Sequence, residues 1–140
     1  MPDATPAAPA PFSFPVRVYW EDTDAGGVVF YANYLKFFER ARTEWLRARG
    51  FEQQRLRQEA GLMFVVVQTA VRYLQPARLD DRLDISVEVR HAAQASLQFV
   101  QRALRQGTIV AEGDIKIGCV DAHSFRPRRI PAELLQETTT

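Results

Sequence analysis

Residues 33–50 read NYLKFFERARTEWLRARG, and this stretch decides the fold. Apolar side chains recur in it at intervals of three and four positions, which predicts an amphipathic helix that begins at Asn33 as a capping residue and is closed by Gly50. The apolar stripe consists of Tyr34, Phe37, Phe38, Ala41, Trp45 and Ala48. Because so much of this stripe is aromatic, other parts of the chain have to cover the helix.

The segments that flank the helix have the composition of β-strands. Residues 12–20 alternate apolar and polar, and this predicts one buried face. A polar segment over residues 53–60 predicts a short second helix that ends at Gly61, and four segments rich in Val, Ile and Phe follow it. The expected buried face of the first strand consists of Phe12, Phe14, Val16, Val18 and Trp20, and the four later segments cover residues 64–74, 82–91, 96–105 and 108–120.

The connections between these segments favour antiparallel pairing. Gln106-Gly107 predicts a tight hairpin, and Pro131 suits the first position of a last helical turn. We therefore predict an α+β domain whose sheet wraps around the long helix. Such a sheet leaves edge strands open, so we expect the chain to pair with a second copy.

Composition limits the classes of function. The chain has 140 residues, which fits one domain over residues 12–140, and residues 1–11 are a Pro/Ala-rich segment expected to be a flexible tail. Lys and Arg number 18 against 17 for Asp and Glu, which argues against nucleic acid as a partner. The single cysteine, Cys119, lies in an apolar setting and is expected to be a reduced core thiol. With no apolar run long enough for a membrane span and no secretion signal, we expect a cytoplasmic location.

Residues 21–29, EDTDAGGVV, concentrate three carboxylates and two glycines between the first strand and the helix. The structural interpretation is that Asp22 and Asp24 form local side-chain turns and that the glycines supply positive φ angles. A calcium loop is rejected because Gly26 and Asn33 stand where further ligands are needed. No Gly-Lys-Ser/Thr follows the glycines, so the loop is not a phosphate-binding loop of that type.

Several motifs together resemble the hotdog-fold acyl-CoA thioesterases. They are VRVYWEDTDAGGVV over residues 16–29, ANY over 32–34, FERAR over 38–42, PARLDD over 76–81 and CVD over 119–121. The chain is most similar to the branch that holds the Tol-Pal-associated and the 4-hydroxybenzoyl-CoA thioesterases. The resemblance implies a five-stranded antiparallel sheet around a central helix, a homodimer or homotetramer with active sites at subunit interfaces, and an association with the Tol-Pal envelope system.

The same resemblance assigns roles in the acidic loop. It implies that Asp24 is the catalytic carboxylate, acting as nucleophile or as general base, and that the backbone amide of Tyr31 stabilises the oxyanion. Gly26 and Gly27 would let the main chain turn and the thioester approach. Acyl-CoA is then the substrate, coenzyme A is part of that substrate, and we expect neither a separate cofactor nor a metal.

Two positions qualify this assignment. Many Tol-Pal-associated relatives have His where this chain has Tyr31, so a role for an imidazole is in question although the backbone amide remains. Glu39 is a rival carboxylate because other hotdog thioesterases carry their acid on the central helix. The preferred interpretation of Glu39 is an ion pair with Arg40 or Arg42.

Binding of the substrate requires cations for phosphate and an apolar pocket. The candidates for phosphate contacts are Arg126 and Arg128, followed by Arg90, although solvated surface arginines explain the same pattern. Phe64 and Val65 are candidates to line an acyl pocket, and core packing explains them equally well.

The sequence therefore predicts an enzyme that hydrolyses an acyl-CoA thioester to a free acid and coenzyme A. His91 and His123 share no metal-ligand spacing, and no Gly-x-Ser-x-Gly motif exists. The alternative is a hotdog protein that binds an acyl thioester or an envelope partner without turnover. A hotdog dehydratase is a weaker alternative, because it would need a catalytic His that the loop lacks.

Overall fold

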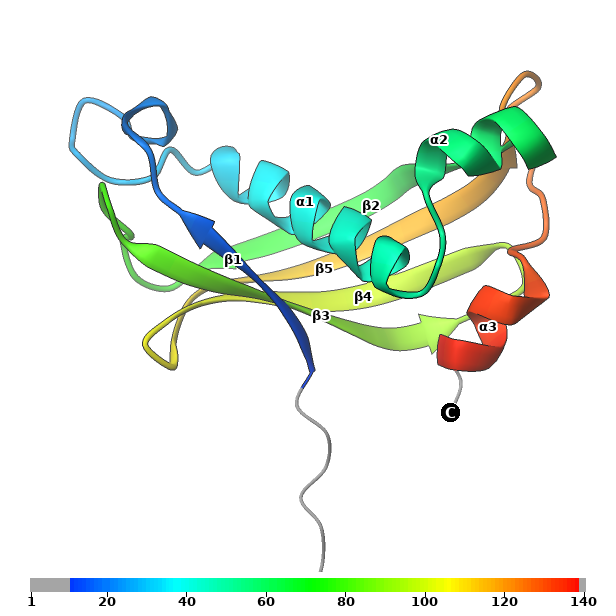
Figure 1. Cartoon of the computed structure of the whole chain (residues 1–140). Coiled ribbons are helices and arrows are strands. Elements are labelled where there is room, and N and C mark those ends of the chain that lie inside the picture. Colours follow the sequence, from blue (N-terminus) through cyan, green and yellow to red (C-terminus); the bar gives the residue numbers. More distant parts are fainter. Residues whose placement is uncertain (1–10, 139–140) are drawn as a thin grey trace, which may run out of the picture.

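One curved antiparallel sheet wraps around the helix α1, Asn33–Ala48, in the computed structural model, which describes residues 11–138 and the side chains of residues 11–135 (Figure 1). The expected tail, residues 1–11, lies outside the described residues except for Pro11. The five strands are arranged in the order β1-β3-β4-β5-β2. Their bounds are β1 Phe12–Arg17, β2 Leu62–Tyr73, β3 Arg82–Ala92, β4 Ser96–Arg105 and β5 Thr108–Asp121. The predicted α+β hotdog architecture is confirmed.

Short helical elements complete the chain. The predicted second helix consists of α2, Gln53–Arg55, followed by a π-helical turn over Leu56–Ala60, and Gly61 ends it in the left-handed conformation at φ 67°. α3, Ala132–Thr138, follows Pro131 as expected. None of the described helices is both long and apolar enough to cross a membrane.

The core lies between α1 and the concave face of the sheet. Trp45 is 1% exposed and packs edge-on against Phe99 of β4, with 5.2 Å between ring centroids. The helix packs closely over Gly113 of β5, where an added Cβ atom would lie 2.9 Å from a ring carbon of Phe38. A fully buried polar side chain, Gln101, donates to the main-chain oxygen of Phe38 and so ties the helix to the sheet.

The hairpin between β4 and β5 has the predicted geometry. Gln106 and Gly107 both have positive φ angles, 50° and 81°, as a type I′ turn requires. Cys119, on β5, is buried as expected, and burial raises the pKa of its thiol.

The start of the chain differs from the prediction. β1 ends at Arg17, and Trp20 begins a 3-10 turn, Trp20–Asp22, where its side chain is 81% exposed instead of buried. The reason is local hydrogen bonding. The Asp22 carboxylate accepts the amide of Tyr19 at 2.8 Å and bends the chain out of the strand.

Two details of α1 also differ. Asn33 is the first residue of the helix and not its cap, because its side-chain amide donates to the main-chain oxygen of Asp22 at 2.9 Å. Ala48, expected in the buried stripe, is exposed, and Leu46 is buried instead.

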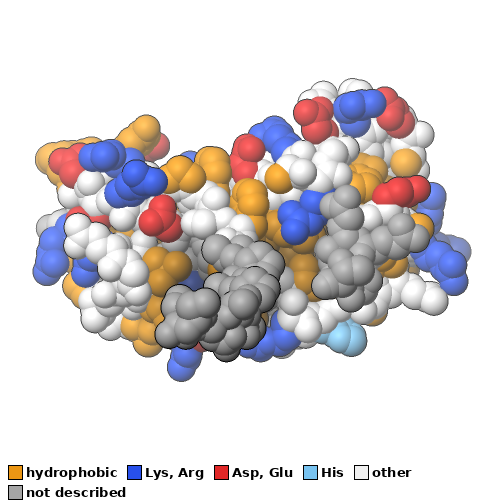
Figure 2. All heavy atoms as spheres, turned by 60° about the horizontal axis from the view of Figure 1, so that its bottom comes forward, with side chains coloured by type: hydrophobic (Ala, Val, Ile, Leu, Met, Phe, Trp, Pro, Cys, Tyr) orange, Lys and Arg blue, Asp and Glu red, His pale blue; other side chains and the backbone are white. Residues whose placement is uncertain are grey.

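The sheet face opposite α1 carries charges of both signs. Arg102 pairs with Glu112 at 2.6 Å and with Glu88 at 3.3 Å, and Glu112 also pairs with Arg72 at 2.6 Å. Figure 2 brings this underside forward and shows blue side chains along its lower edge and side chains of both signs toward the upper part of the view.

Candidate functional site

Asp22 is buried beneath the acidic loop and stabilises it through hydrogen bonds. Its side chain is only 6% exposed, and its main-chain oxygen accepts the amide of Phe30 and the side chain of Asn33, both at 2.9 Å. Asp22 thereby joins the two arms of the loop to the first residue of α1. Figure 1 shows that this loop lies next to the first turn of the helix.

Asp24 lies at the exposed tip of the loop. One carboxylate oxygen, Oδ1, accepts the amide of Gly26 at 2.8 Å, so the local side-chain turn considered in the structural interpretation is present. The main-chain oxygen of Asp24 accepts the amide of Gly27, whose φ of 78° closes the turn. The second oxygen, Oδ2, has no partner among the described residues and faces solvent. The turn therefore fixes the carboxylate and leaves one oxygen available for chemistry.

Free main-chain donors lie at the start of α1. The amides of Tyr31 and Ala32 donate to no protein acceptor within the described part of the chain, whereas the next amide, that of Asn33, donates to Phe30. Unpaired amides and the helix dipole both favour negative charge at this point. This end of the helix can therefore stabilise a developing oxyanion.

A cavity of about 280 Å³ with three tyrosines in its wall opens at the same end of the helix. The hydroxyl of Tyr73 donates to the main-chain oxygen of Tyr31 at 3.2 Å, and its ring contacts those of Tyr31 and Tyr34. Burial raises the pKa of the Tyr34 and Tyr73 hydroxyls, which keeps both protonated. The lining residues are Val28, Val29, Tyr31, Tyr34, Tyr73, Leu74, Gln75 and Pro76. We call this the tyrosine cavity.

The loop over residues 74–81, which forms one wall of the tyrosine cavity, is held by Arg105. Its guanidinium donates to the main-chain oxygen of Pro76 and to the carboxylate of Asp81, both at 2.9 Å. Burial on its own would raise the pKa of Asp81, but the amide of Arg78 and the Arg105 guanidinium outweigh burial and lower that pKa. Sequence patterns gave no signal for Arg105 or Tyr73.

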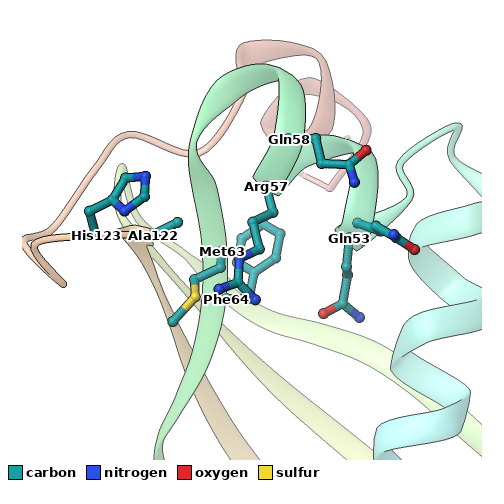
Figure 3. Close-up of a pocket in the computed structure, with 8 residues that line it drawn as sticks. Gln53, Arg57, Gln58, Met63, Phe64, Ala122 and His123 are labelled. Carbon is teal, nitrogen blue, oxygen red and sulfur yellow. The ribbon is translucent and has the colours of Figure 1, made fainter.

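A second cavity, of about 750 Å³, lies at the opposite end of β2 (Figure 3). Its lining residues are Gln53, Gln54, Arg57 and Gln58 from α2 and the π-helical turn, Met63 and Phe64 from β2, and Ala122 and His123 after β5. We call it the arginine cavity. Of the two candidate acyl-pocket residues, Phe64 lines this cavity and Val65 does not. Phe64 and Tyr73 are separated by about 30 Å along the strand, so one chain does not bring its two cavities together.

The three predicted phosphate-binding arginines are in different situations. Arg90 pairs with Asp114 at 2.6 Å on the sheet face opposite α1, and Arg128 pairs with Asp121 at 2.9 Å. The side chain of Arg126 has no partner among the described residues. Two of the three predicted cations are therefore already held in ion pairs.

Glu39 does not form the expected ion pair. Among the described residues its carboxylate accepts the Thr43 hydroxyl at 3.2 Å, whereas Arg42 donates to Gln101 at 2.9 Å. Glu39 and Arg42 therefore form no salt bridge among the described residues, because the sheet offers Arg42 a buried amide oxygen. Burial lowers the pKa of Arg42, and the charge of Glu39 still acts in the opposite direction.

Fold and site together define an α+β protein that places a free carboxylate oxygen and unpaired helix amides at one end of the molecule, which is an arrangement suited to acyl transfer. Comparisons with known proteins agree with this class. Residues 18–137 match the model of the thioesterase-like superfamily. The chain belongs to this superfamily, and the predicted thioester hydrolase class is confirmed.

Individual relatives cover most of the chain. The acyl-CoA thioesterase YbgC of Haemophilus influenzae is 49% identical over 123 residues, which are 88% of this chain and 90% of the relative. The acyl-CoA thioester hydrolase YbgC of Escherichia coli is 46% identical over 90% of this chain and 94% of its own length. Among solved structures, a probable thioesterase from Bartonella henselae superposes with a TM-score of 0.82 at 34% identity, over 87% of this chain and all of that one.

Proposed function

We propose that this chain hydrolyses acyl-CoA thioesters to a free carboxylic acid and coenzyme A. Two features carry the proposal: one Asp24 carboxylate oxygen and the Tyr31 amide at the start of α1, each without a protein hydrogen-bond partner among the described residues. The acyl-CoA thioesterase and hydrolase activities named for the two YbgC relatives support the choice of substrate.

The proposed reaction places the thioester carbonyl at the helix start. As general base, Asp24 takes a proton from water, the water oxygen attacks the carbonyl carbon, and the Tyr31 amide donates to the resulting oxyanion. The carbon–sulfur bond then breaks, and the thiolate takes up the proton. As nucleophile, Asp24 instead forms an anhydride that water hydrolyses, with the same products.

A panel of acyl-CoA substrates tests the proposal. We expect wild type to release coenzyme A and Asp24→Asn to lose at least about a hundredfold in kcat, since general-base or nucleophilic catalysis contributes this much or more. Glu21→Gln, a neighbouring exposed carboxylate, is the matched control and should keep wild-type kcat. If wild type binds acyl-CoA without releasing coenzyme A, the non-catalytic alternative replaces this proposal.

Single turnover in ¹⁸O-labelled water detects the nucleophilic mechanism. Label enters the Asp24 carboxylate only if an anhydride forms and water attacks its aspartyl carbon, whereas a general base sends all of the label to the product acid. Mass analysis of the peptide that contains Asp24 measures the difference.

The proposed active unit is a homodimer joined along β2. In the described sheet, β1 and β2 are the two edge strands. β1 contains Pro15, which discourages further pairing, whereas β2 exposes Val66 and Val67 at 53% and 56%. A tetramer would need a further interface. A cytoplasmic location and an association with the Tol-Pal system stay predictions.

A further inference from the structure

The arginine cavity contains in its wall a cation, Arg57, without a side-chain partner among the described residues, and nothing in the proposed chemistry uses this cavity. Its volume of about 750 Å³ lies within the range of ligand sites. None of its eight lining residues is acidic. Figure 3 shows the side chain of Arg57 extending from the π-helical turn to Met63 and Phe64, which form an apolar floor.

Arg57 is available to a ligand. Among the described residues its guanidinium donates to no protein acceptor, and its main-chain oxygen accepts the amide of Gly61. Arg55, two residues earlier, pairs with Glu59 instead. The π-helical turn itself is a conformation found often at functional sites.

The lining of the cavity indicates the chemistry of its ligand. A guanidinium is suited to a phosphate group, and the carboxamides of Gln54 and Gln58 are suited to amide groups. The carboxamide of Gln53 already donates to the Thr43 hydroxyl at 3.0 Å and offers its oxygen as an acceptor. The cavity combines apolar side chains, carboxamides and one guanidinium. This combination fits an extended ligand that carries two amides and ends in a phosphate. Phosphopantetheine, the arm that carries the thioester in coenzyme A and in carrier proteins, has this composition.

Strand geometry indicates which active site the arm would reach. Phe64 pairs with Cys119 and Tyr73 pairs with Ala111, both buried core residues, so Phe64 and Tyr73 lie on the same face of the sheet. If two β2 strands pair antiparallel about their middle, the start of one lies about 5 Å from the end of the other. The arginine cavity of one copy is then next to the tyrosine cavity of the second copy.

We propose that the arginine cavity binds the phosphopantetheine arm of the thioester, with Arg57 on its phosphate, and serves the Asp24–Tyr31 site of the second copy. This inference rests on the proposed function and on its β2 dimer. It assigns the principal phosphate contact to Arg57 in place of the paired Arg90 and Arg128.

Kinetics with matched substrates test the phosphate contact. For an acyl-CoA, Arg57→Gln should raise KM about tenfold with kcat within about twofold, which is the loss of one charge-assisted hydrogen bond. For the same acyl group on pantetheine, which lacks phosphate, KM should stay unchanged. Arg55→Gln is the matched control and should change neither. Equal KM values for wild type and Arg57→Gln on acyl-CoA, or equal rises on both substrates, would overturn the inference.

Two further measurements separate this inference from the proposed function. Calorimetry of free coenzyme A binding to Asp24→Asn, with and without Arg57→Gln, requires no turnover, and an unchanged Kd contradicts the phosphate contact. Acyl-carrier protein as substrate identifies the source of the arm. If Arg57→Gln raises KM for both acyl-carrier protein and acyl-CoA, the contact is to the phosphate that the two substrates share. If it raises KM for acyl-CoA alone, the contact is to the nucleotide phosphates.

Heterodimers test the placement across the interface. Chains carrying Asp24→Asn and Arg57→Glu are co-expressed with different affinity tags, and the heterodimer is purified. The inference predicts one intact site per heterodimer, so kcat/KM should reach about half of wild type. Activity no higher than the mean of the two homodimers overturns the placement.

Discussion

The Asp121 carboxylate, at the end of β5, holds the turn that follows it. The amides of Ser124 and His123 donate to Oδ1 at 2.9 Å, and Arg128 donates to Oδ2 at 2.9 Å. The two amides, and then Arg128, lower the pKa of Asp121 from 3.8 to about 2. This turn borders the arginine cavity through Ala122 and His123.

Acid should therefore remove a specific contribution of Asp121. A folded-state pKa below the unfolded value stabilises the fold above the unfolded pKa, and the contribution is lost as pH falls from 3.8 toward about 2. We predict that wild type exceeds Asp121→Asn in free energy of unfolding at about pH 5 and that the difference shrinks below about pH 4. Urea titrations across this range measure it, and a difference independent of pH contradicts the prediction.

At the level of elements, the contact between α1 and β5 depends on the absence of a side chain at Gly113. An added Cβ would lie 2.9 Å from both Phe38 and Ile115, closer than such atoms approach in proteins. We predict that Gly113→Ala lowers the free energy of unfolding by about 1–3 kcal/mol, the range for overpacked cores. Urea unfolding measures the change.

Gly118, on the same strand, provides the control for this prediction. Its added Cβ would meet Val67 at 3.5 Å, an ordinary contact, so Gly118→Ala should cost clearly less. If the two variants lose equal stability, β-strand glycine substitution in general, and not the helix contact, is the cause.

The element boundaries show what sequence patterns capture. The helix and the first strand follow from the spacing of apolar residues, because burial of one face imposes that spacing, and the four later strands follow from their content of Val, Ile and Phe. Trp20 was misassigned because the alternation continues beyond the strand, and only the buried carboxylate of Asp22 ends it there. No pattern contains that hydrogen bond.

A bulge in β2 limits prediction of the site in the same way. Phe64 and Tyr73 are an odd number of residues apart, so regular alternation places them on opposite faces. The register shift between Val66 and Gln68 brings both to the helix face. The carboxylate loop was therefore recognisable from its motif, whereas the two cavities depend on a backbone irregularity and on distant contacts such as Tyr73 to Tyr31.

For the whole molecule, the exposed edge of β2 connects assembly with activity. A lysine at a sheet edge opposes pairing, so Val67→Lys should convert the proposed dimer to a monomer and lower kcat/KM by roughly tenfold or more, because each site needs both copies. Sedimentation velocity and thioesterase assays measure the two effects. Ser13→Lys, exposed on the other edge strand, is the control and should change neither.

Two outcomes would contradict this assembly. If Val67→Lys is a fully active monomer, the active site is not shared between two copies. If Val67→Lys is a fully active dimer, the interface does not lie along β2. Either result leaves the chemistry proposed for Asp24 open to its own test.

The two tryptophans occupy opposite extremes of exposure, Trp45 at 1% and Trp20 at 81%. Indole fluorescence depends strongly on contact with water, so the protein carries a pair of built-in optical probes with well-separated emission. Trp20 lies within four residues of Asp24 and reports on the carboxylate loop, whereas Trp45 reports on the core beside Phe99. Replacing either one by Phe leaves a chain in which ligand arrival at the loop and melting of the interior can be followed by separate spectroscopic signals.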